Sequence, residues 1–494
     1  MKKVLILCSI IIVLMLAACG DAADYYDEQD DPMPYVPQET IELDEPDEPS
    51  EAEESEEPDI TKEAAERTLD FIPSIDLDVA AELFAIVQAI WDEDDGQLIG
   101  VPLHAPLMIS DVLTRHAVTN QPDAFGQFIR HGDVYVGIVP ENIFVGANPA
   151  TVSGTLWGTA GIEYYMSGDF DKTDFIRLLI HEGFHAIQDY IISGQIARGN
   201  NFVHFNEAEA RISAVLEIEA LFAALRSDGD ERLTHIHNAL SLRNSRRYGR
   251  SVVGRTENQH EINEGLAMLA EYMLVSGDTE TALEWLESAW TSSRVGSRLN
   301  ISSGYYSGVL YAMLLNETDA DWISGISYSS DLGQLLQDYH GINELRTLER
   351  HDLEQYGYST LAPIERAWAE HRQEIIAWSD AAIDGSRVVL AGHNFITNFV
   401  IFESILLNRG DGSGHFLFYG YFVVEGVNYI LELRGGVIER LLMPDRILVG
   451  DVNDITVDDS QTRATAPTWT LEITDEAYKI EQLDNGQIRI VTRD

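Results

Sequence analysis

The sequence of 494 residues predicts an α+β protein, in which a mixed region with a mostly helical second half precedes a smaller β-rich C-terminal domain. Three observations support this prediction. Short β-favouring runs broken by Gly, Pro and Asn occupy residues 133–166. Apolar residues then recur at helical spacing from residue 171 to about 382, and after Asp384 they alternate at period two. We therefore place the first domain at residues 61–384 and the second at residues 385–494.

The N-terminal stretch MKKVLILCSIIIVLMLAACG has the composition of a secretion signal, with two lysines, an apolar run and small residues before a cysteine. Its end, LAAC, resembles a bacterial lipobox. The resemblance implies that residues 1–18 are a signal peptide removed before Cys19, and that a lipid on Cys19 holds the protein at the outer face of the bacterial cell membrane. An ordinary cleaved signal and a short membrane anchor are the alternatives, but the apolar run is short for a membrane span.

Residues 19–60 are rich in Asp, Glu and Pro and contain no Lys or Arg, which predicts a disordered, self-repelling tether. They hold 18 of the 83 acidic residues, so most of the net charge of −51 belongs to the rest of the chain. Such an acidic surface argues against nucleic acid or anionic lipid as a partner. The only cysteines are Cys8 and Cys19, so the folded part has no disulfide and depends on burial for its stability.

Within the first domain, apolar spacing predicts helices over residues 61 to about 130, in ITKEAAERTLDFI and DLDVAAELFAIVQAIWDEDD. Strands and hairpins are expected next, in DVYVGIVPENIFVG and TLWGTAGIEYYM. In the C-terminal domain, the runs that alternate are GHFLFYGYFVV, VNYILELRGG, TWTLEIT and YKIEQLDNGQIRIV. The DNG in the last run predicts a tight hairpin.

The segment LLIHEGFHAI, residues 178–187, lies in a predicted helix. Asp171 or Thr173 can cap its start, and Ser193–Gly194 can end it. An apolar stripe at spacings of three and four predicts its buried face. The stripe consists of Ile176, Ile180, Phe184, Ile187 and Ile191.

The motif HEGFH places His181 and His185 four residues apart, so both imidazoles can reach one cation from the same side of a helix. Glu182 is rotated about 100° around the helix from His181 and would lie beside the cation rather than on it. A general base for a metal-activated water needs this position. The alternative is a core helix that carries two histidines and a glutamate by chance.

The same segment resembles the active-site helix of zincin metallopeptidases. The metzincin extension is absent, because Gln188 and Ile191 stand where that group has a glycine and a third histidine. A glutamate further along the chain would make the protein gluzincin-like. The resemblance implies a zincin-like catalytic domain with bound Zn²⁺ and a peptide or protein substrate.

Three glutamates are candidates for the third metal ligand: Glu207 in FNEAEA, Glu217 in AVLEIEAL and Glu264 in EINEGLAMLAEY. We favour Glu264, because INEGLA resembles the ligand-bearing stretch of aminopeptidase-like and collagenase-like gluzincins. The adjacent Gly265 would let two helices approach closely. Glu271 lies on the same helix face and is either an acceptor for a ligand histidine or an ordinary surface residue.

From about residue 145 to 320, the order of motifs also resembles a group of uncharacterised secreted bacterial HExxH proteins. Gluzincins use a Tyr or His after the third ligand to stabilise the oxyanion, which makes Tyr305, or else its neighbour Tyr306, a candidate catalytic residue. In zincins the substrate pairs with an edge strand that precedes the metal helix, and by position this would be Thr155–Met166. Trp157 in that segment can equally be a core residue.

These observations predict a surface-anchored, zinc-dependent peptidase in which His181, His185 and Glu264 bind Zn²⁺ and Glu182 is the general base. The alternative is a non-enzymatic lipoprotein that uses a zincin-like scaffold for binding or adhesion. Metal-dependent hydrolysis of something other than peptides is a weaker third hypothesis. The β-rich domain carries no chemical motif and is expected to dock substrate or to shield the cleft.

Overall fold

The fold is known from a computed structural model, which describes most of the chain from Leu69 onward. The described residues are 69–140, 143, 145–162, 171–194, 202–293, 299–318, 321–381, 387–391, 395–408, 414–425, 429–440, 446–451, 455–466, 469–482 and 488–493. The predicted signal peptide at 1–18, Cys19, the tether at 19–60 and the domain boundary at Asp384 lie outside them. Among the described helices, none combines the length and the apolar character needed to cross a membrane.

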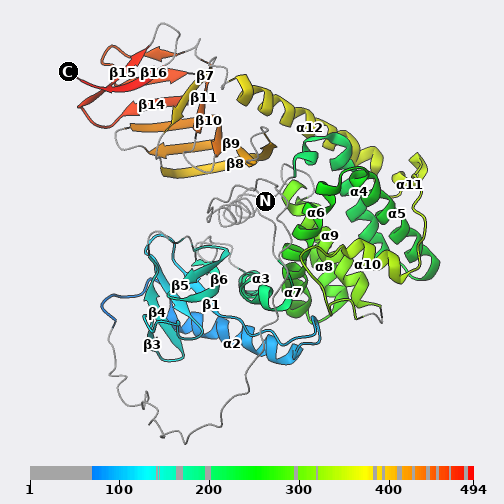
Figure 1. Ribbon diagram of the computed structural model, residues 1–494. Helices are drawn as coiled ribbons and strands as arrows, with labels where there is room; N and C mark the ends of the chain where they lie inside the picture. Colours follow the sequence, from blue (N-terminus) through cyan, green and yellow to red (C-terminus); the bar gives the residue numbers. More distant parts are fainter. Residues whose placement is uncertain are drawn as a thin grey trace, which may run out of the picture.

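The chain is of mixed α+β content, and Figure 1 shows a sheet and two helices followed by a helical half and a second sheet. The first part contains α2 (Leu77–Asp94), β1 (Leu107–Ser110), β2 (His116–Thr119), β3 (Ile129–His131), β4 (Val134–Ile138), β5 (Asn148–Val152), β6 (Thr155–Gly161) and α3 (Lys172–Ile191). Asp76 caps α2 by accepting hydrogen bonds from the backbone N–H groups of Asp78 and Val79.

The helical prediction for residues 61 to about 130 is right for α2 and wrong for the residues that follow it, where β1, β2 and β3 form. These strands are only three or four residues long, and all four side chains of β1 are buried. A short strand covered on both faces shows no alternation, so periodicity cannot distinguish it from a buried piece of helix.

The six strands form one sheet in the order β3-β4-β2-β1-β6-β5. Neighbouring strands are antiparallel except β1 and β6, which are parallel. The prediction that Thr155–Met166 supplies an edge strand is therefore wrong: β6 lies between β1 and β5, and β5 is last in the order. Trp157 of β6 is fully buried and stacks on Phe128 with ring centroids 6.3 Å apart, so it is a core residue.

Helix α3 packs directly against β6, and one glycine permits this contact. A Cβ atom on Gly158 would lie 2.3 Å from the backbone carbonyl carbon and oxygen of Glu182, closer than any real contact. Because Gly158 has no side chain, the sheet can approach the backbone of the HEGFH segment.

The helical half contains α4 (Ala208–Leu225), α5 (Gly229–Arg247), α6 (Ser251–His260), α7 (Leu266–Ser276), α8 (Thr279–Ser293), α9 (Leu299–Asn316), α10 (Leu332–Tyr339), α11 (Arg350–Glu354) and α12 (Tyr358–Ala381). Two short helical turns complete it, the 3₁₀ turn η2 (Val203–Asn206) and the π-helical turn η3 (Glu261–Gly265). This agrees with the helical pattern predicted from residue 171 to about 382.

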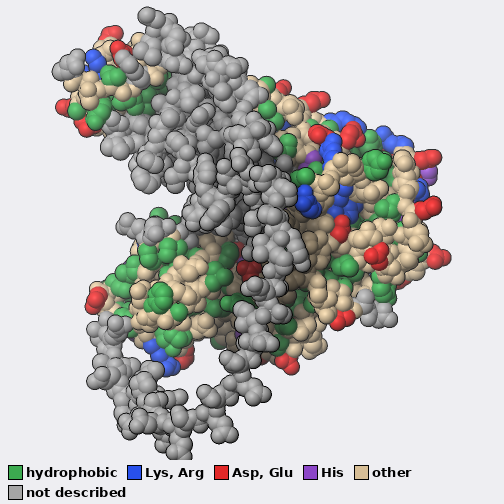
Figure 2. Space-filling model, viewed as in Figure 1, with side chains coloured by type: hydrophobic (Ala, Val, Ile, Leu, Met, Phe, Trp, Pro, Cys, Tyr) green, Lys and Arg blue, Asp and Glu red, His purple; other side chains and the backbone are tan. Residues whose placement is uncertain are grey.

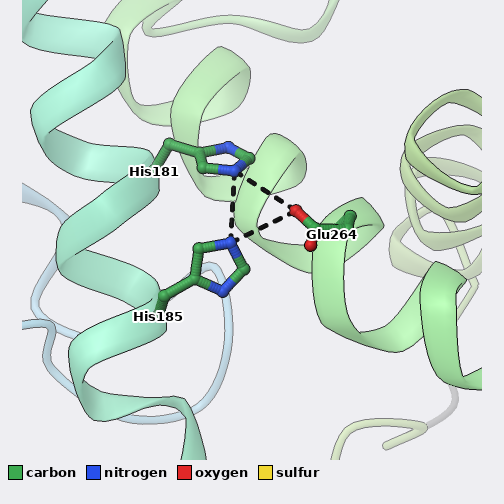
Figure 3. Close-up of side chains that lie close together, drawn as sticks. All are labelled: His181, His185 and Glu264. Carbon is green, nitrogen blue, oxygen red and sulfur yellow. Dashed lines mark hydrogen bonds and ion pairs between the residues drawn. The ribbon is translucent and has the colours of Figure 1, made fainter. Parts of the chain in front are cut away.

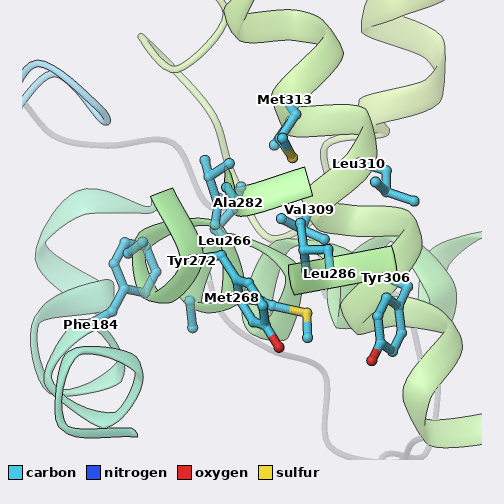
Figure 4. Packing of buried hydrophobic residues seen from close by; sticks show 14 of the residues in the cluster. Phe184, Leu266, Met268, Tyr272, Ala282, Leu286, Tyr306, Val309, Leu310 and Met313 are labelled. Atoms are coloured by element: carbon cyan, nitrogen blue, oxygen red, sulfur yellow. The ribbon is translucent and has the colours of Figure 1, made fainter. Parts of the chain in front are cut away.

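One continuous cluster of buried apolar side chains extends from Ile75 to Ala362 and joins α2, α3 and the first sheet to the helical half. Figure 4 shows where they meet, with Phe184 of α3 facing the Leu266–Tyr272 segment of α7, and with Val309 and Leu310 of α9 nearby. The metal-binding residues predicted from the sequence therefore lie at a junction between two packed halves.

Helix α12 leads into the β-rich C-terminal part. Its strands are β7 (Arg387–Ala391), β8 (Phe395–Asn408), β9 (Gly414–Glu425), β10 (Tyr429–Arg440), β11 (Arg446–Asp451), β12 (Thr456–Val457), β13 (Arg463–Ala466), β14 (Trp469–Ile473), β15 (Tyr478–Gln482) and β16 (Ile488–Thr492). Strands β7 to β14 share one sheet. Strand β15 pairs antiparallel with β16, and the DNG segment predicted to turn between them lies outside the described residues.

The surface of the described residues carries charges of both signs. In the space-filling view, acidic side chains are scattered over the helical half, and basic side chains gather near its upper edge (Figure 2). Some exposed side chains of the described residues form ion pairs, for example Arg226 with Glu280 and Glu287. Exposed pairs of this kind contribute about 0–1 kcal/mol each, so the fold depends on its buried core.

Candidate metal site

The site is built on α3, whose start and end follow from local sequence. The side chain of Asp171 accepts a hydrogen bond from the backbone N–H of Thr173, which confirms the predicted cap. The helix ends at Ile191, just before Gly194, whose φ of +92° suits glycine. Ile176, Ile180 and Phe184 of the predicted stripe are buried. His181, Glu182 and Gln188 are buried as well, because the sheet covers one side of α3 and α7 another.

Three side chains converge at the junction of α3 and η3 (Figure 3). The Nε2 atoms of His181 and His185 are 3.2 Å apart. Glu264 Oε2 lies 3.6 Å from the first of these atoms and 3.3 Å from the second. The described residues thus hold a triad that could bind a metal ion, and it is the triad predicted from the sequence.

The separations fit a tetrahedral ion. Ligand atoms bound at about 2.0–2.2 Å to such an ion lie about 3.3–3.6 Å from one another. Two of the observed separations, 3.3 and 3.6 Å, fall in this range, and the third, 3.2 Å, lies just below it. Two histidine nitrogens and one carboxylate oxygen also leave a fourth corner for another ligand.

When both imidazoles are neutral, their Nε2 lone pairs and a lone pair of the Glu264 carboxylate face one another. His181 Nδ1 lies 3.1 Å from Glu271 Oε2, and His185 Nδ1 lies 2.8 Å from Gln188 Oε1. Because both partners accept, both Nδ1 atoms carry the hydrogen when the rings are neutral, and both Nε2 atoms carry a lone pair. Two lone pairs and a carboxylate oxygen at these distances repel one another unless a metal ion or a proton lies between them.

The close contacts within the triad also shift the pKa values of its three residues. Burial lowers the pKa of His181, but hydrogen bonds to Glu264 and Glu271 outweigh it and raise the value to about 10. His185 is shifted upward as well, against its burial, chiefly by the charge of Glu264. Burial would raise the pKa of Glu264, but His185 and the hydrogen bonds of both imidazoles hold it well below its usual range. The cluster therefore favours positive charge at its centre.

Glu264 is carried by the π-helical turn η3, which interrupts the continuous helix formed by α6 and α7. Single π turns inside α-helices occur often at functional sites. Asn263 Nδ2 donates to Glu264 Oε1 at 2.8 Å, which leaves Oε2 to face the two imidazoles. Gly265 and Gly308 of α9 are in backbone contact, since a Cβ on Gly265 would lie 2.5 Å from Gly308 Cα. This close approach confirms the predicted reason for Gly265.

The other two glutamates considered as ligands lie elsewhere. Glu207 is exposed at the start of α4 and pairs with Arg250 at 2.7 Å. Glu217 is buried among cations, 2.6 Å from Arg246 and 3.3 Å from Arg243, and it accepts a hydrogen bond from Tyr311. Neither carboxylate belongs to the triad.

Glu261, the first residue of η3, belongs to a buried ionic cluster. Arg243 binds both oxygens of Glu261 at 2.5 Å, and Ser307 donates to the same carboxylate at 2.8 Å. Arg246 and Arg247 bind Glu257, whose pKa they hold well below its usual range against the effect of burial. The Arg243–Glu261 pair fixes the turn that carries Glu264, three residues further on.

Glu182 is 1% exposed and lies beside the triad, as the sequence predicts. Burial raises its pKa to about 7, and the charges of His181 and His185 oppose that shift only partly. Its Oε2 atom has no hydrogen-bond partner among the described residues. A buried carboxylate oxygen without a partner is costly, and such atoms call for a functional or solvent partner.

The two candidate tyrosines have different surroundings. Tyr305 stacks on His181 with ring centroids 5.9 Å apart and an interplanar angle of 10°, so it borders the triad. His260 meets Tyr305 edge-on at 5.4 Å. Tyr306 is buried against Trp290, 4.9 Å between centroids, and belongs to the core. Of these two tyrosines, Tyr305 is therefore the one next to the triad.

Four residues around the triad were not singled out in the sequence: Gln188, Asn263, His260 and Arg177. Arg177 supports Glu271, with Nε 3.3 Å from Oε1, and stacks on the ring of Tyr272. Helical spacing could have indicated Arg177 and Gln188, which lie on α3 four residues before His181 and three after His185. For Asn263 and His260 the sequence carries no such signal, because their contacts depend on how η3 packs.

Comparison of the chain with protein-family models, with curated protein sequences and with solved structures gave no significant match.

Proposed function

We propose that the protein is a zinc-dependent peptidase with a zincin-like catalytic domain. The observation that carries the proposal is the convergence of two imidazole nitrogens and one carboxylate oxygen at 3.2–3.6 Å. Neutral imidazole and carboxylate in tetrahedral array suit Zn²⁺, and three protein ligands with an open corner are typical of catalytic rather than structural zinc.

In this proposal His181, His185 and Glu264 hold the zinc ion, and Glu271 orients His181 through Nδ1. Bound zinc would polarise the scissile carbonyl and lower the pKa of water. Glu182 accepts the proton of the attacking water on its unpartnered Oε2 and passes it to the leaving amine. Tyr305, stacked on His181, is the candidate donor to the oxyanion.

The substrate strand is reassigned from β6 to β5. Strand β5 ends the sheet order and packs against α3, so an extended peptide that added to it would run along the metal helix. Pro149 lies in this strand, and proline is tolerated where a strand has a free edge. The substrate class is therefore an extended peptide segment.

The test uses the purified protein with three readouts: zinc content, cleavage of a peptide library and inhibition by a chelator. We expect one zinc per chain and cleavage that a chelator abolishes. Glu182→Gln should keep the zinc and lower kcat by about 10²–10⁴-fold. Glu207→Gln, a change at an exposed glutamate, is the matched control and should alter neither zinc content nor cleavage.

Full cleavage by Glu182→Gln would refute this mechanism. Stoichiometric zinc without hydrolysis of any library peptide would favour the non-enzymatic lipoprotein instead. The location is a separate proposal: if a lipid on Cys19 anchors the protein outside the cell, Cys19→Ser should move it from the membrane fraction to the soluble fraction.

A further inference from the structure

Gln188 is a buried polar residue of α3 that uses both ends of its side-chain amide. It is 2% exposed and lies three residues after His185. Its Nε2 donates to the backbone carbonyls of Ile262 and Asn263, both at 3.0 Å, and its Oε1 lies 2.8 Å from His185 Nδ1. A single side chain thus contacts one proposed ligand and the two residues that precede another.

The orientation of the amide follows from these partners. Carbonyl oxygens only accept hydrogen bonds, so the NH₂ group must face Ile262 and Asn263, and the oxygen must face His185. His185 Nδ1 therefore donates, and the lone pair of the ring lies on Nε2, which points to Glu264. Gln188 selects the tautomer that can bind a metal.

The NH₂ group of Gln188 donates hydrogen bonds to backbone carbonyls of η3. A π turn inserts one residue into the helix and disturbs the i to i+4 hydrogen-bond ladder, which makes carbonyls in the turn available to outside donors. Gln188 Nε2 occupies two of them, immediately before Glu264. Gly265 lets the other side of the same turn contact Gly308. The turn is thus held from two directions, by α3 and by α9.

We propose that Gln188 is a positioning residue that couples the two halves of the metal site, setting the tautomer of His185 and holding the turn that presents Glu264. This inference rests on the proposed metal site and adds a residue to it. Neither of two replacements of similar size does both tasks. Leucine offers neither an acceptor nor a donor, and an ionised glutamate accepts from His185 but places a negative oxygen against two carbonyls.

The experiment compares Gln188→Leu and Gln188→Glu with wild type. Gln337→Leu is the matched control, because Gln337 also donates to a backbone carbonyl, that of Ile342 at 2.9 Å, but lies on α10 outside the triad. Three properties are measured on each protein: zinc affinity by competition with a chelator, the visible spectrum of the Co²⁺ form, and the tautomer of His185 by ¹⁵N NMR of the metal-free protein at a pH where the ring is neutral.

We expect Gln188→Leu to weaken zinc binding by about 10–100-fold and to lose the Nδ1–H tautomer of His185. Gln188→Glu should keep that tautomer, lose zinc affinity and alter the Co²⁺ spectrum, because only its donor function is gone. Gln337→Leu should match wild type in all three. If Gln188→Leu does not fold, the split between tautomer and affinity in Gln188→Glu decides the proposal.

Two results would separate this inference from the proposed function. If wild type binds zinc, His181→Ala does not, and Gln188→Leu and Gln188→Glu both bind like wild type, the role of Gln188 is wrong while the metal site stands. If wild type binds no zinc, the proposed function is wrong. In that case, an unchanged tautomer of His185 in Gln188→Leu would also overturn the inference. Loss of the Nδ1–H tautomer in this variant would support the claim that Gln188 sets the tautomer.

Discussion

Replacing Gly265 by alanine tests the link between helix packing and metal binding. The added Cβ would lie 2.5 Å from Gly308 Cα and 2.8 Å from Gly308 C. Carbon atoms in ordinary contact are about 3.5–4.0 Å apart, so η3 and α9 must separate by roughly 1 Å. Both contacting atoms belong to the backbone, so no side-chain rotation can relieve the clash.

The cost follows from two opposed effects. Overpacking of a core contact costs about 1–3 kcal/mol. Alanine has a helix propensity about 1 kcal/mol better than glycine. We therefore expect Gly265→Ala to lower the free energy of unfolding by about 0–2 kcal/mol. Because Glu264 is the adjacent residue, the same displacement should weaken zinc binding about tenfold or more.

Gly254→Ala is the control within the preceding helix α6. Its Cβ would meet Arg247 Cδ at 3.7 Å, an ordinary contact. This change should raise the free energy of unfolding by about 0.5–1 kcal/mol and leave zinc affinity unchanged. Urea denaturation of the metal-free proteins and chelator competition measure the two quantities. The packing argument fails if Gly265→Ala gains stability as Gly254→Ala does, or binds zinc as tightly as wild type.

Three further predictions concern the surroundings of the triad. Arginines hold the pKa values of Glu257 and Asp331 below their usual range. The stability that these two carboxylates confer is therefore complete above about pH 5 and is lost as the pH falls further. The unfolding free energy of wild type should therefore drop more steeply between pH 7 and pH 4 than that of Glu257→Gln, and equal slopes would contradict this. Glu271→Ala removes the acceptor of His181 Nδ1 and should weaken zinc binding by about 10–100-fold in chelator competition, whereas an unchanged dissociation constant would exclude the orienting role. Tyr305→Phe keeps the ring stacked on His181 but loses the hydroxyl; we expect unchanged zinc content and kcat lowered by about 10²–10³-fold, and an unaltered kcat would remove Tyr305 from the mechanism.

Local features were the most predictable from the sequence. Asp171 caps α3 because a cap depends on a few neighbouring residues, and β15 pairs antiparallel with β16, its neighbour in the sequence. The short strands β1, β2 and β3 escaped prediction because they are too brief, and β1 too completely buried, to show a period. The edge position of β5 was also missed, since strand order is set by pairing between distant segments.

The sequence by itself determined that two imidazoles lie on one face of a helix with a carboxylate beside them, because spacing of i and i+4 is a property of any α-helix. Only the tertiary structure decided which glutamate joins them. Glu217 and Glu264 both lie on helices of apolar pattern, but one meets arginines and the other meets His181 and His185. That choice and the hydrogen bonds from Gln188 to the π turn depend on contacts between residues more than 70 positions apart, which no local pattern encodes.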